Sequence, residues 1–237
     1  MFSRSAAYYD LIYQAVGKDY EAESVRLRGL FQLYEFPHGS SLLDVGCGTG
    51  AHLVYLKDFY SVEGLDLDQG MLVQAKSKLP DIPFHQADMV EFSLGRTYDL
   101  VVGLFSSIGY ATTEATLNAT IRRMADHTRE GGLVIVEPWL GPESYRAGIP
   151  HAVFVDQPEL KIARMDVSQV EDRVSILRFH YLVASKEGVE SFAERHDLGL
   201  FTQAEYLSAF EAAHLAPTYD PQGLDGRGLY LGVKSMK

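Results

Sequence analysis

The chain has 237 residues, of which 46% are hydrophobic and 22% are charged, values expected of one globular domain with a sizeable core. Its formal net charge of −11 and its lack of a basic cluster exclude a nucleic-acid surface and argue against anionic membranes, since phosphate binding needs grouped Lys and Arg. A single cysteine, no apolar run of membrane-spanning length and no signal-peptide core predict a cytoplasmic protein without disulfides, and the eight histidines show no metal-ligand spacing.

Tyrosines crowd the beginning of the chain, at Tyr8, Tyr9, Tyr13 and Tyr20. Residues 19–34 then carry apolar side chains at helical spacing, and a Pro-His-Gly turn ends this helix. We interpret residues 1–36 as a helical lid whose hydroxyls line the entrance for a substrate. A plain hydrophobic cover without a role in binding is the competing interpretation.

A short apolar strand at residues 42–45 runs into a glycine-dense turn, DVGCGTG, at residues 44–50. Glycines let a backbone approach a ligand closely and adopt positive φ. The turn satisfies the G-x-G-x-x-G/A dinucleotide template, and Asp66 follows about 20 residues later, as that template expects. It also resembles the D-x-G-x-G-x-G signature of class I S-adenosylmethionine methyltransferases. Asp44 favours the second interpretation, because a carboxylate there repels a pyrophosphate but suits an ammonium or a sulfonium.

Strands and helices alternate after this turn. We expect strands at residues 62–67, 84–86, 98–104 and 133–139, and helices at residues 51–57, 69–78 and 114–127, the last closed by Gly131-Gly132. This order predicts an α/β fold with a doubly wound parallel sheet, the Rossmann-like fold of class I methyltransferases.

Three further residues extend the expected cofactor site along these strand ends. Asp66 ends the second strand, where it can accept the ribose hydroxyls, and Asp88 ends the third, where it can accept the adenine amino group. Met89 is placed to cover the adenine, and Leu104 ends the next strand near the methionine moiety. Capping of a helix by Asp66 and a core position for Met89 are the structural alternatives.

The pattern changes after Pro142. Residues 154–155, 160–170, 174–184 and 189–200 have the pattern of extended segments separated by turns, with no helix between them. We predict an antiparallel sheet at residues 143–200, inserted into the single domain of residues 1–237, that caps the site and offers an edge for a homodimer. A helix at residues 203–213 and strands at residues 216–219 and 228–233 then return to the main sheet.

The segment FSSIGY at residues 105–110 follows the fourth strand, where a substrate is expected. Ser106 and Ser107 leave room for the substrate, Tyr110 offers a hydroxyl, and Trp139 is expected to form a wall. Arg227 lies between two glycines, a setting in which a guanidinium can meet a phosphate.

Strings spread along the chain resemble the N,N-dimethyltransferases of nucleotide-linked deoxyaminosugars. They are YDLIYQAVGKDYEAE, SLLDVGCGTGAHL, HQADM, FSSIGY, VIVEPW, FHYLVA, GLFTQAEY and GRGLYLGV. The resemblance implies S-adenosyl-L-methionine as cofactor and an amine on a dTDP-linked sugar as acceptor, methylated twice.

The positions along the chain and the resemblance together assign residues. Cofactor contacts are expected from Tyr13, Asp44, Gly46, Gly48, Asp66, Asp88, Met89 and Leu104. Substrate contacts are expected from Tyr9, Tyr20, Ser106, Ser107, Pro138, Trp139, Arg164, His180 and Arg227, with Arg227 on the pyrophosphate. Tyr110 and Tyr9 are expected to position the amine or relay its proton. Another small amine or hydroxyl acceptor, a cofactor sensor without catalysis and a nicotinamide dehydrogenase are the alternatives.

Overall fold

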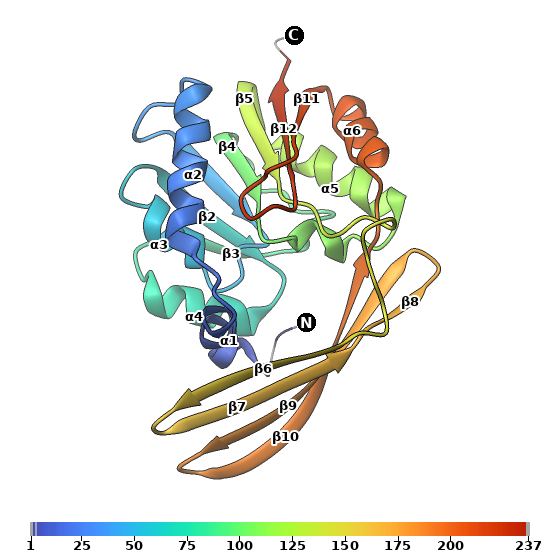
Figure 1. Cartoon of the computed structure of the whole chain (residues 1–237). Helices are drawn as coiled ribbons and strands as arrows, with labels where there is room; N and C mark the ends of the chain where they lie inside the picture. Colours follow the sequence, from blue (N-terminus) through green and yellow to red (C-terminus); the bar gives the residue numbers. More distant parts are fainter. Residues whose placement is uncertain (1, 3, 236–237) are drawn as a thin grey trace.

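The computed structural model, which describes residue 2 and residues 4–235, contains two sheets, and the second lies across one end of the domain built on the first (Figure 1). The expected domain and lid begin at residue 1 and the domain ends at residue 237. These predicted ranges therefore include residues 1, 3 and 236–237, which lie outside the described residues.

The main sheet has seven strands in the order β11-β12-β5-β4-β1-β2-β3. Five are parallel: β1 (Ser41–Val45), β2 (Ser61–Asp66), β3 (Phe84–Gln86), β4 (Tyr98–Gly103) and β5 (Thr128–Val136). The antiparallel pair β11 (Leu215–Asp220) and β12 (Leu229–Lys234) extends the sheet beyond β5. The central strands are buried on both faces, as their continuous apolar runs predict. The doubly wound α/β sheet predicted from the sequence is therefore confirmed.

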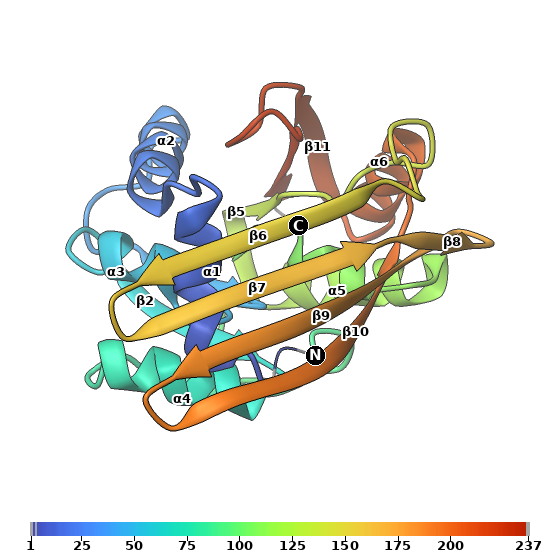
Figure 2. The same ribbon diagram turned by 60° about the horizontal axis from the view of Figure 1, so that its bottom comes forward.

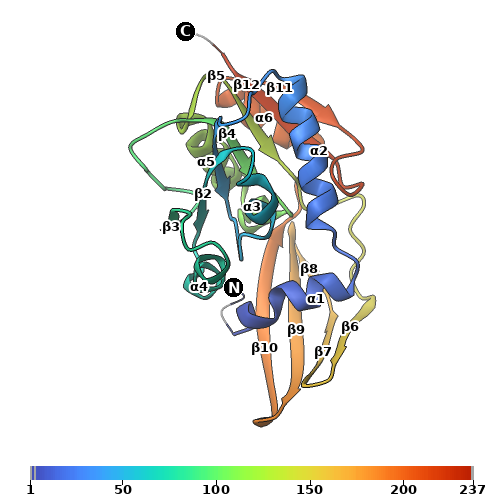
Figure 3. The same ribbon diagram turned by 90° about the vertical axis from the view of Figure 1, so that its left-hand side faces the viewer.

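Helices cover both faces of the main sheet. On one face lie α2 (Tyr20–Leu33), α3 (Ala51–Leu56) and α4 (Gln69–Lys78), and on the other lie α5 (Glu114–Asp126) and α6 (Gln203–Ala212) (Figures 1 and 3). In α2, Leu27 and Phe31 are fully buried in the core with β1. This helix belongs to the main fold, although the sequence pattern placed it in the lid.

The Gly131-Gly132 pair does not end α5, which stops at Asp126. Both glycines lie inside β5, where the pairing register with β4 shifts. A Cβ on Gly132 would come within 2.9 Å of the Asp99 carbonyl oxygen, so the two strands approach too closely there for a side chain. The glycines mark a bulge in the strand, and the prediction that they close the helix is wrong.

The second sheet consists of four long antiparallel strands that cross the open end of the main domain (Figure 2). They are β6 (Pro150–Gln157), β7 (Leu160–Val167), β9 (Val174–Ser185) and β10 (Gly188–Gly199), and the short β8 (Gln169–Glu171) pairs with β9. Alternate residues face inward and outward. We call this unit the capping sheet.

A short helical segment lies between the two sheets (Figure 3). It comprises a 3₁₀ turn at Ala6–Tyr8 and α1 (Tyr9–Ala15). Ile12 packs into an apolar cluster with the capping sheet. On the other side, the Asp10 carboxylate accepts hydrogen bonds from Thr49 Oγ1 and Lys78 Nζ, both at 2.6 Å. Helix α1 thus joins the capping sheet to the glycine-rich turn. Within the described chain, none of the helices has the length and apolarity needed to cross a membrane.

Candidate active site

A cavity of about 1050 Å³ lies between the carboxyl ends of the main-sheet strands, α1 and the inner face of the capping sheet. This is the switch-point location at which open α/β sheets bind ligands, and the volume suits a nucleoside cofactor together with an acceptor. Sixteen of the expected site residues line it: Tyr9, Tyr13, Tyr20, Asp44, Gly46, Gly48, Asp66, Asp88, Met89, Leu104, Ser106, Ser107, Tyr110, Trp139, Arg164 and Arg227.

The glycine-rich turn between β1 and α3 forms one wall of the cavity. The backbone N–H groups of Gly46 and Cys47 donate to the Leu65 carbonyl at 2.7 and 2.9 Å, which holds the turn against β2. Gly46 has a φ of 76°, and a Cβ there would lie 2.5 Å from Ser107 Cβ. Only glycine satisfies both the dihedral and the packing at this position.

Asp44 supplies an unsatisfied carboxylate beneath this turn. Its side chain is 1% exposed, and no described group hydrogen-bonds its Oδ1. Burial raises the pKa of Asp44 to about 8, and the nearby charge of Asp66 contributes to this rise. A ligand with an ammonium group would restore the ionised form, whereas a pyrophosphate would oppose it. The site therefore fits S-adenosylmethionine better than a dinucleotide.

Two more carboxylates are oriented by backbone N–H groups at the ends of β2 and β3. Asp66 accepts from the N–H of Gly48 through Oδ2 and from the N–H of Asp68 through Oδ1, both at 2.8 Å. Asp88 Oδ1 accepts from the N–H of Val90 at 2.9 Å. Asp68, rather than Asp66, is the N-cap of α4. Both strand-end acids are thus fixed at the cavity, where they can accept from hydroxyl and amino groups of a nucleoside.

Aromatic rings enclose the middle of the cavity. Tyr9 and Tyr13 lie with ring centroids 4.6 Å apart, and Phe105 contacts Tyr13 and Tyr20 edge-on at 4.8 and 6.1 Å. Burial raises the pKa of Tyr9, of Tyr20 and of Tyr110 well above the usual 10. These hydroxyls therefore stay protonated at neutral pH, so they serve as hydrogen-bonding groups and not as bases.

Tyr110 is hydrogen-bonded across the cavity to His196 of the capping sheet. The Tyr110 hydroxyl lies 2.8 Å from His196 Nδ1. Burial lowers the pKa of His196 to about 3, so the ring is neutral, and no described group bonds its Nε2. His196 was not predicted from the sequence as a site residue. Its signal was the two-residue alternation of β10, in which it shares the inward face with Phe192 and Leu198.

The turn after β4 is held in an unusual backbone conformation. Phe105 and Ser106 have φ values of 49° and 62°, a region that non-glycine residues rarely adopt. Glu137, which is fully buried, accepts from the Phe105 N–H at 2.6 Å, and Ser106 Oγ donates to the Pro138 carbonyl at 2.8 Å. Pro138, which was expected to contact the substrate, is not among the cavity-lining residues. It instead helps to hold Ser106, which does line the cavity, by accepting this hydrogen bond. Glu137 was not predicted to be a site residue, although the sequence shows an acid directly after a buried strand.

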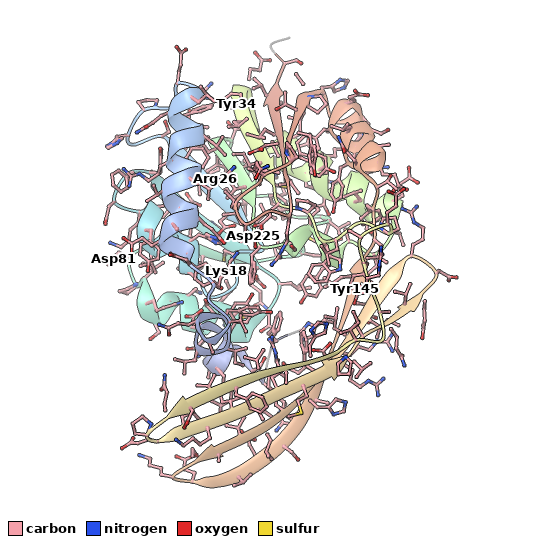
Figure 4. The ribbon with its side chains drawn as sticks, viewed as in Figure 1. Lys18, Arg26, Tyr34, Asp81, Tyr145 and Asp225 are labelled. Atoms are coloured by element: carbon pink, nitrogen blue, oxygen red, sulfur yellow. The ribbon has the colours of Figure 1, made fainter. Side chains whose placement is uncertain are left out.

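Trp139 forms an aromatic wall together with Tyr145. The Trp139 Nε1 donates to Ser175 Oγ at 2.9 Å, and the two rings lie 6.1 Å apart. Figure 4 shows Tyr145 in the connection before β6, where no sequence pattern marked it. A bulky, rigid wall of this kind restricts the shape of an acceptor.

Two arginines bring positive charge to the cavity. Arg164, on the inner face of β7, is 8% exposed, lies 4.5 Å from the Phe179 ring centroid and leaves Nη1 without a partner among the described residues. Arg227 donates from Nη1 to Ser106 Oγ at 3.0 Å and pairs through Nη2 with Asp225 at 3.2 Å. Arg164, which is buried with an unused donor, and Arg227, whose side chain is 28% exposed, both suit an anionic part of a ligand.

His180 is the expected site residue that the structure places elsewhere. On β9, Phe179 and Tyr181 point inward, so His180 between them faces outward, opposite Met165 of β7. The prediction that His180 contacts the substrate is wrong, because neighbouring residues of a strand lie on opposite faces.

The cavity combines an acidic end, a neutral aromatic middle and a basic end. No group of three or more His, Cys, Asp or Glu side chains that could hold a metal ion occurs among the described residues. The arrangement can hold a cationic nucleoside cofactor at β1–β3 and an anionic acceptor near the arginines, with the tyrosines where the two meet.

Proteins of known function are similar in sequence to this chain along nearly its whole length. Residues 42–132 match the family model described as a methyltransferase domain. The chain is 43% identical, over 95% of both chains, to dTDP-3-amino-3,4,6-trideoxy-alpha-D-glucopyranose N,N-dimethyltransferase of Streptomyces venezuelae. It is 41% identical to dTDP-3-amino-3,6-dideoxy-alpha-D-glucopyranose N,N-dimethyltransferase of Streptomyces fradiae, with 98% of this chain and 91% of the relative covered.

Solved structures agree with the sequence relatives. Streptomyces venezuelae DesVI superposes with a TM-score of 0.89 at 41% identity, covering 96% of this chain and 97% of DesVI. The SAM-bound amino pentose methyltransferase CalS10 of Micromonospora echinaspora superposes with a TM-score of 0.86 at 33% identity, with the same coverage of both chains.

Proposed function

The chain belongs to the family of sugar N-methyltransferases that includes the dTDP-aminosugar N,N-dimethyltransferases, and we propose that it methylates the amino group of a dTDP-linked aminodeoxyhexose, once and then a second time. The observation that carries the proposal is the continuity of one cavity, which joins the acidic strand ends of a cofactor site to two arginines. A small uncharged acceptor would not need those arginines.

The acidic end of the cavity would hold the cofactor. Asp44 would face the ammonium group, Asp66 the ribose and Asp88 the adenine, with Met89 and Leu104 against the apolar parts. S-adenosylmethionine supplies a methyl group on a sulfonium sulfur, and the methyl's bond to sulfur breaks as the amine nitrogen bonds to the carbon. Gly46, where a Cβ would collide with Ser107, lets the turn after β1 pack closely against the turn after β4 at this end of the cavity.

The middle of the cavity would position the amine. Tyr9 and Tyr110 keep their protons at neutral pH, and the buried His196 is neutral with a pKa far below that of an amine, so none of them takes the amine's proton. The acceptor must meet the methyl group as the free amine, and the aromatic enclosure favours that uncharged form. After one transfer, loss of a proton from the product restores a nucleophilic nitrogen for the second.

The basic end would hold the diphosphate, with Arg227 as its main partner and Arg164 as a second cation. A panel of dTDP-3-amino and dTDP-4-amino sugars with methyl-labelled cofactor tests the proposal. We expect label in at least one sugar, with mono- and dimethylated products appearing in sequence. Label in no sugar would refute the aminosugar acceptor, and equal turnover of free amines would favour another small-molecule acceptor.

We also infer that two copies associate through the capping sheet. Its outward face carries exposed apolar side chains, among them Phe154, Met165, Leu182 and Val189, exposed by 62%, 47%, 52% and 70%. Several large apolar side chains exposed on one sheet support an interface there. We further propose a cytoplasmic location, which agrees with a free thiol at Cys47.

A further inference from the structure

A network of charged side chains lies behind the arginine expected to hold the diphosphate. The same Asp225 oxygen, Oδ2, lies 3.2 Å from Arg227 Nη2 and 3.6 Å from Lys18 Nζ. Figure 4 shows Lys18 and Asp225 side by side, where the connection between α1 and α2 meets the connection between β11 and β12. The carboxylate therefore bridges two cations from distant parts of the chain.

The two cations are already compensated before any ligand binds. Lys18 also pairs with Glu23 at 2.5 Å, and the fully buried Glu137 lies close enough to both cations that each lowers its pKa, which burial raises. Two positive side chains thus face three carboxyl groups. A diphosphate brought to Arg227 would compete with Asp225 for Nη2 of the same guanidinium, and the two anions would repel each other, so full use of this guanidinium by phosphate requires the carboxylate to move away.

The position of Asp225 allows this exchange. Its side chain is 26% exposed, and it lies between Gly223 and Gly226, both with positive φ, in a turn outside the sheet. Lys18 is already within ion-pair distance of the same carboxylate, so Asp225 keeps a cation when it gives up the arginine. Without Lys18, displacement from Arg227 would leave this partly exposed carboxylate without a cation beside it.

We propose that Asp225 is a placeholder anion, which occupies Arg227 in the empty enzyme and moves onto Lys18 when the substrate's diphosphate takes its place. The inference rests on the proposed function, since it assumes a diphosphate-bearing substrate. It makes Asp225 a residue that sets specificity, because only a ligand with more negative charge than one carboxylate displaces it. It also links substrate binding to the α1–α2 connection through Lys18.

Calorimetric titration of the protein, saturated with S-adenosylhomocysteine, with dTDP tests this proposal. Asp225→Asn keeps the shape but removes the competing charge, so we expect dTDP to bind about 2- to 5-fold more tightly than to the wild type, the range of one partly exposed ion pair. Asp220→Asn is the matched control. Asp220 lies at the start of the same connection, is 29% exposed and pairs with Arg26 at 3.3 Å, outside the cavity lining.

Whether Asp225→Asn strengthens or weakens dTDP binding distinguishes a placeholder role of Asp225 from a role in orienting Arg227. If Asp225 only orients Arg227 for the substrate, Asp225→Asn weakens dTDP binding, and the placeholder role is overturned. Equal affinity, or equal tightening in Asp220→Asn, overturns it as well, because the effect would then be absent or due to net charge. A wild type that binds S-adenosylhomocysteine but not dTDP refutes both the placeholder and the proposed nucleotide substrate, whereas a change of the wrong sign refutes the placeholder alone.

Discussion

Gly46→Ala tests the geometry of the cofactor turn. A non-glycine residue in the left-handed region costs about 1–2 kcal/mol. The new Cβ would also lie 2.5 Å from Ser107 Cβ and 2.8 Å from Ser107 Oγ, and overpacking of a tight site costs about 1–3 kcal/mol. We expect the free energy of unfolding to fall by about 2–5 kcal/mol in denaturant titration, the sum of these two costs, and S-adenosylhomocysteine to bind more weakly.

Two further variants separate the two costs. Gly95 has a φ of 67°, and a Cβ at that position would have no atom within 4 Å, so Gly95→Ala should lose only the backbone contribution of about 1–2 kcal/mol. Ser107→Gly in the Gly46→Ala background removes the colliding atoms and should return the overpacking part, measured as a coupling energy in a double-mutant cycle. If Gly46→Ala is no more destabilised than Gly95→Ala, or if Ser107→Gly gives no recovery, the packing argument is refuted.

Four other predictions concern the site and the assembly. Folding keeps a proton on Asp44 between its unfolded pKa of about 4 and its folded pKa of about 8, so stability should fall as pH rises through this window, and Asp44→Asn should flatten the fall. By the same reasoning, S-adenosylhomocysteine binding at pH 7 should release protons, seen as a buffer-dependent enthalpy that Asp44→Asn abolishes; a buffer-independent wild type would contradict the pairing. Tyr110→Phe and His196→Phe should each lower kcat/KM about 10-fold without adding in the double variant, His196→Asn should retain most activity, and additive losses would show that the two residues act separately. Leu182→Asp, on the outer face of the capping sheet, should give monomers in sedimentation equilibrium with activity per chain retained, and an unchanged mass would exclude this face as the interface.

Much of the fold could be predicted because local patterns agree with tertiary structure. The helix at Gln69–Lys78 and the strand at Phe84–Gln86 match the prediction residue for residue. The failure at Gly131-Gly132 has a physical cause. Glycine marks both helix ends and strand bulges, and only the pairing of β4 with β5 distinguishes the two.

The two ends of the site also differ in how far the sequence predicts them. The residues of the cofactor end follow from strand ends, which lie at one edge of a parallel sheet whatever the loops do. The partners of the substrate end depend on how a second sheet folds back over the first, and no local pattern encodes that. His196 reaches Tyr110 across 86 positions, and Lys18 meets Asp225 from the opposite end of the chain. Alternation within β9 and β10 was nevertheless visible in the sequence, and it favours His196 over His180.

The central claim is that one cavity holds an amine at the tyrosines while Arg227 holds the diphosphate of the same molecule. Its most direct test is the ratio of kcat/KM for a dTDP-linked aminosugar to that for the same aminosugar without the nucleotide, measured in the wild type and in Arg227→Met. We expect a large preference for the linked sugar in the wild type, most of it lost in the variant through a higher KM. A wild type that methylates both forms equally well, or a preference that Arg227→Met leaves intact, would contradict the account.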